Sequence, residues 1–127
     1  MVSFIEHIGI NVYDMDETID FYKQLGFELL RPPHDRPTGG GLSAHMRKGK
    51  SELEIFCPPK EGETVGVEHV GFTVENIDKV YEEFSKKGFQ FTRGKGGVPD
   101  KPRAAGTRRV VFLTDPNGII LQLVEMP

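Results

Sequence analysis

The sequence predicts an α+β fold made of two βαβββ modules. The first observation is a repeated strand pattern, because "EHIGINV" (residues 6–12) and "EHVGFTV" (residues 68–74) are nearly the same seven residues. The second is a constant offset of 62 residues between the copies, which also places Gly26 on Gly88. One such module cannot bury its hydrophobic face alone, so two modules are expected to pack together, within the chain or across a dimer.

The segment that follows each copy of the repeat is predicted to be an amphipathic helix. Apolar residues recur at helical spacing in both segments. Asp16 and Asp78 are placed early in these helices, where acidic residues are favoured, and Gly26 and Gly88 are placed as helix stops. The two segments are residues 14–27 and 76–89.

The remainder of each module reads as strands separated by turn residues. The predicted strands are residues 27–32, 42–48 and 51–56 in the first module, and 89–93, 107–114 and 119–125 in the second. A Gly/Pro-rich loop follows the second strand of each module, at residues 32–41 and 94–106. Residues 57–66 form the predicted linker. We therefore expect a single domain over residues 1–127, with one module at about 1–57 and the other at about 66–127.

The bulk properties narrow the function classes. The net charge is −3, which argues against a nucleic-acid surface because such surfaces are normally basic. No apolar run approaches the length of a membrane span, and the N-terminus lacks the pattern of a signal peptide. Cys57 is the one cysteine, so an internal disulfide is excluded. A cytoplasmic protein with a small-molecule substrate, and with no nucleic-acid or membrane partner, is expected.

Each copy of the repeat presents a histidine on the more polar face of its strand. Side chains alternate across a strand, so residues two apart share a face. The two faces that carry histidine are Ile5, His7, Gly9 and Asn11 in the first copy, and Val67, His69, Gly71 and Thr73 in the second. The opposite faces are wholly apolar and should pack under the helices. The glycines on the histidine faces leave room for a ligand, so these faces are predicted to line a cavity.

Two further polar residues interrupt apolar strands at equivalent places. Glu54 lies within "LEIF" and Gln122 within "IILQLV", each in the last strand of its module. A carboxylate on a half-buried strand is costly unless it is paired or binds a metal. Taken singly, each residue has an ordinary alternative, a hydrogen-bonded histidine or an edge residue facing water. Together with His7 and His69 they favour a site for one divalent ion of Zn, Ni, Co, Mn or Fe(II).

Other polar and aromatic residues are weaker candidates for the same cavity. His45 alternates with Ser43 and Arg47 on the third predicted strand, where an exposed residue is the alternative reading. His34 lies in a predicted loop and is expected to face solvent. The candidate substrate-lining residues are Asn11, His45, Phe56 and Thr73.

Three segments together resemble the vicinal oxygen chelate superfamily. Its members include glyoxalase I, methylmalonyl-CoA epimerase, extradiol dioxygenases, fosfomycin-modifying enzymes and bleomycin-binding proteins. The segments are "HIGINVYDMDETIDFYKQLGFELL", "EHVGFTVENIDKVYEEFSKKGF" and "FLTDPNGIILQLVE", and the resemblance covers nearly the whole chain. It implies a cupped mixed sheet and a metal bound at the positions matched by His7, Glu54, His69 and Gln122. It also implies that substrate oxygens complete the coordination, and that a homodimer is common.

The departures from that family pattern refine the expected activity. Bacterial glyoxalase I usually has glutamate where this chain has Gln122. Extradiol dioxygenases and fosfomycin enzymes also need a carboxylate there, so Gln122 counts against both. Asn11 stands where glyoxalase I often has an arginine that holds glutathione, which weakens the case for glutathione.

The function expected from the resemblance is a metal-dependent lyase or isomerase of glyoxalase I type, similar to lactoylglutathione lyase. The metal would polarise two vicinal oxygens of the substrate as a Lewis acid. Glu54 is the only carboxylate in the set, so it is the expected catalytic base. The alternatives are an antibiotic-binding protein of bleomycin-resistance type and an Fe(II) extradiol dioxygenase.

Overall fold

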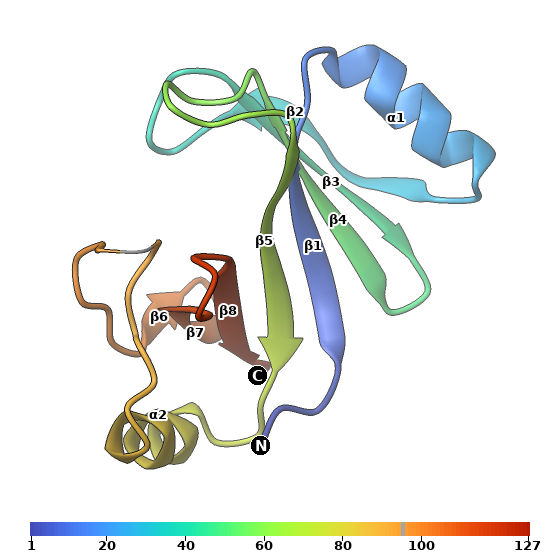
Figure 1. The fold of residues 1–127 in the computed structure, drawn as a ribbon. Helices are drawn as coiled ribbons and strands as arrows, with labels where there is room; N and C mark the ends of the chain where they lie inside the picture. Colours follow the sequence, from blue (N-terminus) through green and yellow to red (C-terminus); the bar gives the residue numbers. More distant parts are fainter. Residues whose placement is uncertain (95) are drawn as a thin grey trace. The chain divides into compact units, whose positions relative to one another are not determined.

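The structure is a computed structural model that describes residues 1–94 and 96–127 (Figure 1). The chain divides into two compact units. The first unit is residues 7–68, and the second unit is residues 69–127 together with residues 1–6. The predicted module limits, about 1–57 and 66–127, stay a prediction.

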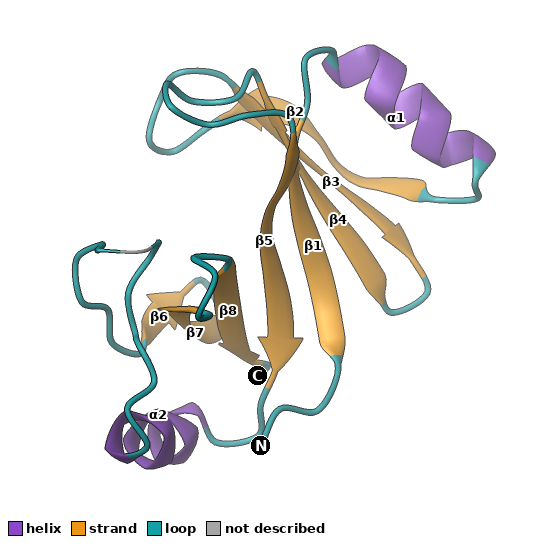
Figure 2. Ribbon diagram, in the orientation of Figure 1, coloured by secondary structure: helices purple, strands orange, loops and turns teal. Residues whose placement is uncertain are grey.

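Both halves of the chain have the element order βαβββ, as predicted (Figure 2). The first set is β1 (Ile5–Asn11), α1 (Met15–Gln24), β2 (Glu28–Asp35), β3 (Leu42–Lys48) and β4 (Ser51–Cys57). The second set is β5 (Gly66–Thr73), α2 (Ile77–Lys86), β6 (Arg103–Ala105), β7 (Arg108–Thr114) and β8 (Ile120–Glu125). In the described part of the chain, no helix is long and apolar enough to cross a membrane.

The strands follow the same pairing plan in both sets. The hydrogen-bonded order is β2-β3-β4-β1 in the first and β5-β8-β7-β6 in the second. In each set the first strand pairs in parallel with the last, β1 with β4 and β5 with β8, while the remaining pairs are antiparallel. The sheets are therefore mixed, which confirms the predicted α+β class.

The two helices begin and end by the same local chemistry. Asp14 and Asn76 are the N-caps, and each side chain accepts a hydrogen bond from the backbone N–H three residues on, at 2.9 and 3.1 Å. The aspartates predicted early in the helices lie in the first turns: Asp16 and Asp78. The helices end at Gln24 and Lys86, and each is followed two residues later by a glycine, Gly26 or Gly88, with a φ value of +100° or +87° that other residues rarely adopt.

The apolar strand faces pack as the alternation predicted. One core cluster joins α1 to strands β3 and β4, and the apolar face of β1 packs against it through Ile8, Ile10 and Val12. The other joins α2 to strands β7 and β8, with Phe72 and Val74 supplied by the apolar face of β5 and its end. The histidine faces of β1 and β5 are thereby turned away from the helices.

One predicted boundary in the first unit is wrong. The predicted loop at residues 32–41 begins later, because β2 continues through Pro32 and Pro33 to Asp35. Within this unit β2 pairs with β3 alone, and its register shifts twice along its length. Proline lacks a backbone N–H, and an edge strand with bulges tolerates it because no ladder bond is lost on its open side.

One predicted strand in the second unit is also wrong. Residues 89–93 form only isolated bridges, Gln90 with Thr114 and Thr92 with Pro99. The Thr114 hydroxyl accepts a hydrogen bond from the Gly94 N–H and donates one to the Thr92 carbonyl, so this segment is held by a side chain and not by a regular backbone ladder. The second strand of this set is instead β6, which lies inside the predicted loop at residues 94–106.

Candidate metal centre

His7 and Glu54 are brought together by the parallel pairing of β1 with β4. Gly9 lies directly opposite Glu54 in that pairing, and His7 is two residues earlier on the same face. Since Gly9 presents no side chain beside Glu54, the carboxylate can extend toward the imidazole. Nε2 of His7 lies 3.8 Å from Oε1 of Glu54. His7 is buried, whereas the Glu54 side chain is 26% exposed and can be reached from solvent.

His45 faces the other oxygen of the same carboxylate. It lies directly opposite Glu54 in the antiparallel β3–β4 pairing, and its Nε2 is 3.7 Å from Oε2 of Glu54. Burial lowers the pKa of His45 from its ordinary value of 6.5, the Glu54 carboxylate partly offsets this, and His34 and Arg31 lower it further. Glu54 is therefore placed between two imidazoles, one at each oxygen.

The second unit repeats this backbone register with different side chains. Gly71 lies opposite Gln122 in the parallel β5–β8 pairing, as Gly9 lies opposite Glu54 in the first unit. His69 is buried two residues before Gly71 and shares its face. On the other side of Gln122 the antiparallel partner is Phe112, whose ring contacts the His69 ring edge-on with centroids 6.0 Å apart.

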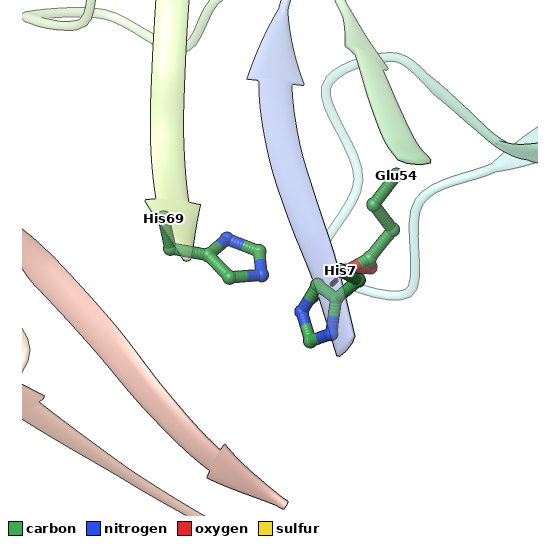
Figure 3. A group of neighbouring side chains, drawn as sticks. All are labelled: His7, Glu54 and His69. Carbon is green, nitrogen blue, oxygen red and sulfur yellow. Dashed lines mark ion pairs between the residues drawn. The ribbon is translucent and has the colours of Figure 1, made fainter. Parts of the chain in front are cut away.

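Three of the four predicted ligands form a cluster of metal-binding groups (Figure 3). One donor atom from each of His7, Glu54 and His69 lies within 4.8 Å of the other two. The 3.8 Å between His7 and Glu54 is below twice the usual metal–ligand distance of about 2.0–2.2 Å, so one ion can contact both. Two imidazoles and a carboxylate are a donor set that suits Zn, Fe, Co, Ni or Mn.

The predicted substrate-lining residues differ in their surroundings. Asn11 is buried, and its side-chain amide donates a hydrogen bond at 3.4 Å to the carbonyl of Thr64, which lies in the predicted linker. Phe56 is half-buried, with the Arg36 guanidinium 5.6 Å from its ring centroid. Thr73 is buried, and its hydroxyl has no hydrogen-bond partner among the described residues. Their contact with a substrate stays a prediction.

Sequence reasoning missed a pair of arginines in the second unit. The guanidinium carbons of Arg93 and Arg103 lie 4.4 and 5.5 Å from the ring centroid of Phe112. Both arginines come from the segment that was predicted to be a strand end and a loop. Loop composition carries no periodicity that would have placed either residue over Phe112.

The sequence pattern of the Glyoxalase/Bleomycin resistance protein/Dioxygenase superfamily matches residues 4–123. The chain belongs to this superfamily. The resemblance noted from the repeated strand motif is thus confirmed for nearly the whole chain, and it covers every residue of the candidate metal centre.

Two distant relatives match this chain nearly from end to end. The chain is 26% identical over 132 residues to the uncharacterized protein YwkD of Bacillus subtilis (strain 168), with 98% of each chain covered. It is 29% identical over 130 residues to a probable lactoylglutathione lyase of Synechocystis sp., with 96% of this chain and 95% of that protein covered.

A solved structure in the same range is the methylmalonyl-CoA epimerase of Streptomyces coelicolor in complex with 2-nitronate-propionyl-CoA. Its TM-score is 0.75 at 26% identity, with 99% of this chain and 96% of that chain covered. The distant relatives of this chain therefore include both lyases and epimerases.

Proposed function

We propose that this protein is a metal-dependent lyase or isomerase of glyoxalase I type, which moves a proton on a small substrate that is chelated through vicinal oxygens. The observation that supports it is the cluster of His7, Glu54 and His69, whose donor atoms lie within 4.8 Å of one another. The likeness to lactoylglutathione lyases and to an epimerase supports the same kind of proton chemistry.

In this proposal His7, Glu54, His69 and Gln122 hold one divalent ion of Zn, Ni, Co, Mn or Fe. Once bound, the ion supplies a Lewis acid that favours loss of a proton from the carbon beside the chelated oxygens. The two histidines are buried, which restricts their rotamers and supports a fixed site. Gln122 is half-buried in β8 and offers a neutral amide oxygen.

Glu54 is the proposed catalytic base. Its carboxylate has one oxygen toward His7 and the other toward His45, so one oxygen can serve the ion while the other accepts the proton. Its partial exposure, 26% of the side chain, leaves a path for substrate. Gln122 cannot accept a proton, and a single base fits removal and return of the proton on one side of the substrate.

Turnover in deuterium oxide tests this proposal. The substrates are hemithioacetals of methylglyoxal with several thiols, and simple α-hydroxycarbonyls. The expected result is product whose reacting carbon carries solvent deuterium, formed only by protein that contains a divalent ion. Tight metal or antibiotic binding without exchange on any substrate would favour the bleomycin-type binding protein instead. Oxygen uptake with catechols would favour the dioxygenase.

A second candidate is proton transfer on a CoA thioester. It is favoured by the likeness to the Streptomyces coelicolor epimerase, which was solved with a propionyl-CoA analogue. Epimerisation needs proton delivery to both faces of one carbon, whereas Glu54 alone supplies one face. Incubation with a single epimer of methylmalonyl-CoA separates the two candidates, since the lyase proposal expects exchange without inversion, or no reaction.

The homodimer also stays a prediction. A small duplicated domain of this superfamily is expected to pair across a twofold axis. Sedimentation velocity at micromolar concentration should give about twice the mass of one 14.2 kDa chain. A monomer that retains full metal affinity would show that each chain completes its own site.

A further inference from the structure

We propose that a groove along α1 is a docking surface for a basic, amphipathic peptide segment of a partner protein. This α1 groove has a volume of about 1030 Å³ and is lined wholly by residues of the first unit. It does not depend on the proposed catalysis. The β1 residues that line it, Ile10 and Val12, lie on the strand face opposite to the one that carries His7.

Large apolar side chains line the α1 groove and are open to solvent. Phe21 is 56% exposed, Tyr13 is 79% exposed, and Val65 at the end of the linker is 46% exposed. Leu25, the C-cap, is 56% exposed one turn after Phe21 and extends the apolar strip along the helix. The Phe21 ring lies edge-on to Tyr22 with centroids 5.3 Å apart, so its position is partly fixed before binding. Exposed apolar side chains that gather along one groove are typical of a surface that binds a partner.

The equivalent helix of the second unit shows that this apolar strip is not needed for folding. The 62-residue offset places Phe21 on Glu83 and Leu25 on Lys87, so α2 is charged where α1 is apolar. Both helices have ten residues and pack against the strands of their own unit. Packing within a unit therefore does not account for the apolar strip of α1, whereas binding of a partner does.

The rim of the α1 groove is acidic. Residues 14–25 contain four acidic residues and one basic residue, whereas the equivalent residues 76–87 contain three of each. Acidic residues in a first turn also favour the helix itself, but the offset places Glu17 on Lys79, so the first turn of α2 tolerates a basic residue there. The acidic residues that line the groove are Asp14, Asp16, Glu17 and Asp20.

The carboxylates of the two helices differ in their partners. On α2, Asp78 pairs with Arg109 and Glu82 pairs with Lys86. On α1, by contrast, no ion pair joins an acidic side chain to a lysine or arginine of the described residues. The negative charge along the α1 groove is therefore not balanced by the fold, and it can attract the cations of a partner.

The occupant follows from this combination of surfaces. An apolar groove with an acidic rim complements a helix that has apolar residues on one face and lysine or arginine beside them. Neither helix of the described chain is of this kind, because α1 is acidic and α2 has equal numbers of both charges. The second unit also balances its β6 and β7 arginines internally, in the pairs Arg103–Asp100, Arg108–Glu6 and Arg109–Asp78. We therefore assign the occupant to a different protein and not to a second copy.

Peptide binding tests the docking surface directly. The probe is a fluorescently labelled helical peptide of leucine and lysine, about four turns long, with the leucines on one face. Its control has glutamate in place of every lysine. Fluorescence anisotropy should show saturable binding of the leucine–lysine peptide to the whole chain and none of the leucine–glutamate peptide. The amide NMR signals of Phe21, Leu25 and Val65 should shift, and added salt should weaken the binding.

The apolar strip is tested by Phe21→Glu/Leu25→Lys, which gives α1 the residues of α2 and leaves the net charge unchanged. This double variant should weaken binding of the probe by at least about 10-fold, because it removes both exposed apolar anchors. Its circular dichroism spectrum should match that of the wild type, since α2 folds with the same two residues.

The acidic rim is tested by Glu17→Gln/Asp20→Asn, which should weaken binding of the probe by roughly 3-fold to 10-fold. Glu82→Gln/Glu83→Gln is the matched control, since it makes the same change in net charge on α2. The control should stay within about twofold of the wild type, because its charges lie outside the α1 groove.

Four results would overturn the proposal. The first is that the leucine–lysine peptide does not bind saturably, and the second is that Phe21→Glu/Leu25→Lys binds it as the wild type does. The third is an equal loss in the α2 control, which would mean attraction to the overall negative charge. The fourth comes from sedimentation velocity without peptide. If Phe21→Glu/Leu25→Lys converts an oligomeric wild type to monomer, the α1 groove is an interface between copies of this chain.

Discussion

In the first unit the oxygen donor on the last strand is Glu54, and in the second unit it is Gln122. Each lies opposite a glycine of the parallel neighbour, Gly9 or Gly71, so the two backbones place their donors in the same way. The antiparallel neighbour differs, because Glu54 faces His45 and Gln122 faces Phe112. Duplication has thus kept the register while the side chains around the donor have diverged.

This divergence gives the oxygen donors of the two units different surroundings. The first has a carboxylate between two imidazoles, which is a place for a proton and a charge. The second has a neutral amide beside the ring of Phe112, and the guanidinium carbons of Arg93 and Arg103 lie 4.4 and 5.5 Å from the centroid of that ring. Two kinds of variant test this comparison. One exchanges the oxygen donors, which differ between the units, and the other removes the helix N-caps, which both units have.

The largest effect is expected from exchanging the donor types. Glu54→Gln keeps an oxygen that can contact the ion but removes the base, so deuterium exchange should slow by about 10²-fold to 10⁴-fold. Gln122→Glu adds a second carboxylate to the proposed set of ligands and should retain or tighten metal binding. It should also permit exchange on the other face of the substrate. Exchange is measured by NMR of the product in deuterium oxide, alongside metal content.

The exchange rate of Glu54→Gln decides whether Glu54 is the base. Wild-type exchange in Glu54→Gln would make Glu54 a ligand alone and place the base elsewhere. Loss of the bound metal in the same variant would leave its slow exchange uninformative about a base, so rates are compared at equal metal occupancy.

A smaller effect tests what the two units share. Asp14→Ala and Asn76→Ala each remove an N-cap side chain, which typically costs about 0.5–2 kcal/mol of unfolding free energy. Asp20→Ala, at an exposed position of α1, is the control and should change stability by less than about 0.5 kcal/mol. Urea unfolding followed by circular dichroism gives the values. If Asp20→Ala lowers the unfolding free energy as much as the two cap variants do, the claim that Asp14 and Asn76 stabilise their helices as N-caps would be wrong.

Much of the fold follows from features that are local in the sequence. The repeat "EHIGINV" and "EHVGFTV" predicted the parallel strands, the glycines at 26 and 88 predicted the helix ends, and alternation predicted which faces are apolar. The errors lie where distant residues decide. Thr114 holds residues 92–94 through its side chain, and the open edge of β2 accepts two prolines, neither of which a local pattern can express.

The candidate site, like the fold, could be predicted where it depends on features that are local in the sequence. Equivalent places in a duplicated unit indicated His7, Glu54 and His69, and the structure brings them together. Their binding of metal stays a prediction, as does the role of Gln122. The pairing of His45 with Glu54 depends on the β3–β4 register, and Arg93 over Phe112 depends on a loop path, so alternation alone could not supply either contact.

The smallest effect concerns His45, which has no imidazole counterpart beside Gln122. Burial lowers its pKa in the folded state below 6.5, so the unfolded chain binds more protons in acid and His45 destabilises the fold as the pH falls below that value. His45→Asn should therefore lose less stability between pH 7.5 and 5.5 than wild type. Unfolding curves at both pH values, on metal-free protein, measure this; an equal or larger loss in the variant would contradict the lowered pKa.

The central claim is that His7, Glu54 and His69 hold one divalent ion, and metal titration tests it most directly. Isothermal titration of chelator-treated protein with Zn²⁺, Ni²⁺, Co²⁺ and Mn²⁺ should give one tight site per chain for at least one ion. His7→Ala and His69→Ala should each weaken it by more than about 100-fold, since loss of even a supporting residue typically costs 10-fold to 100-fold. His34→Ala, outside the cluster, should stay within about twofold of wild type. Absence of divalent binding in the wild type, or unchanged affinity in both His7→Ala and His69→Ala, would contradict the account.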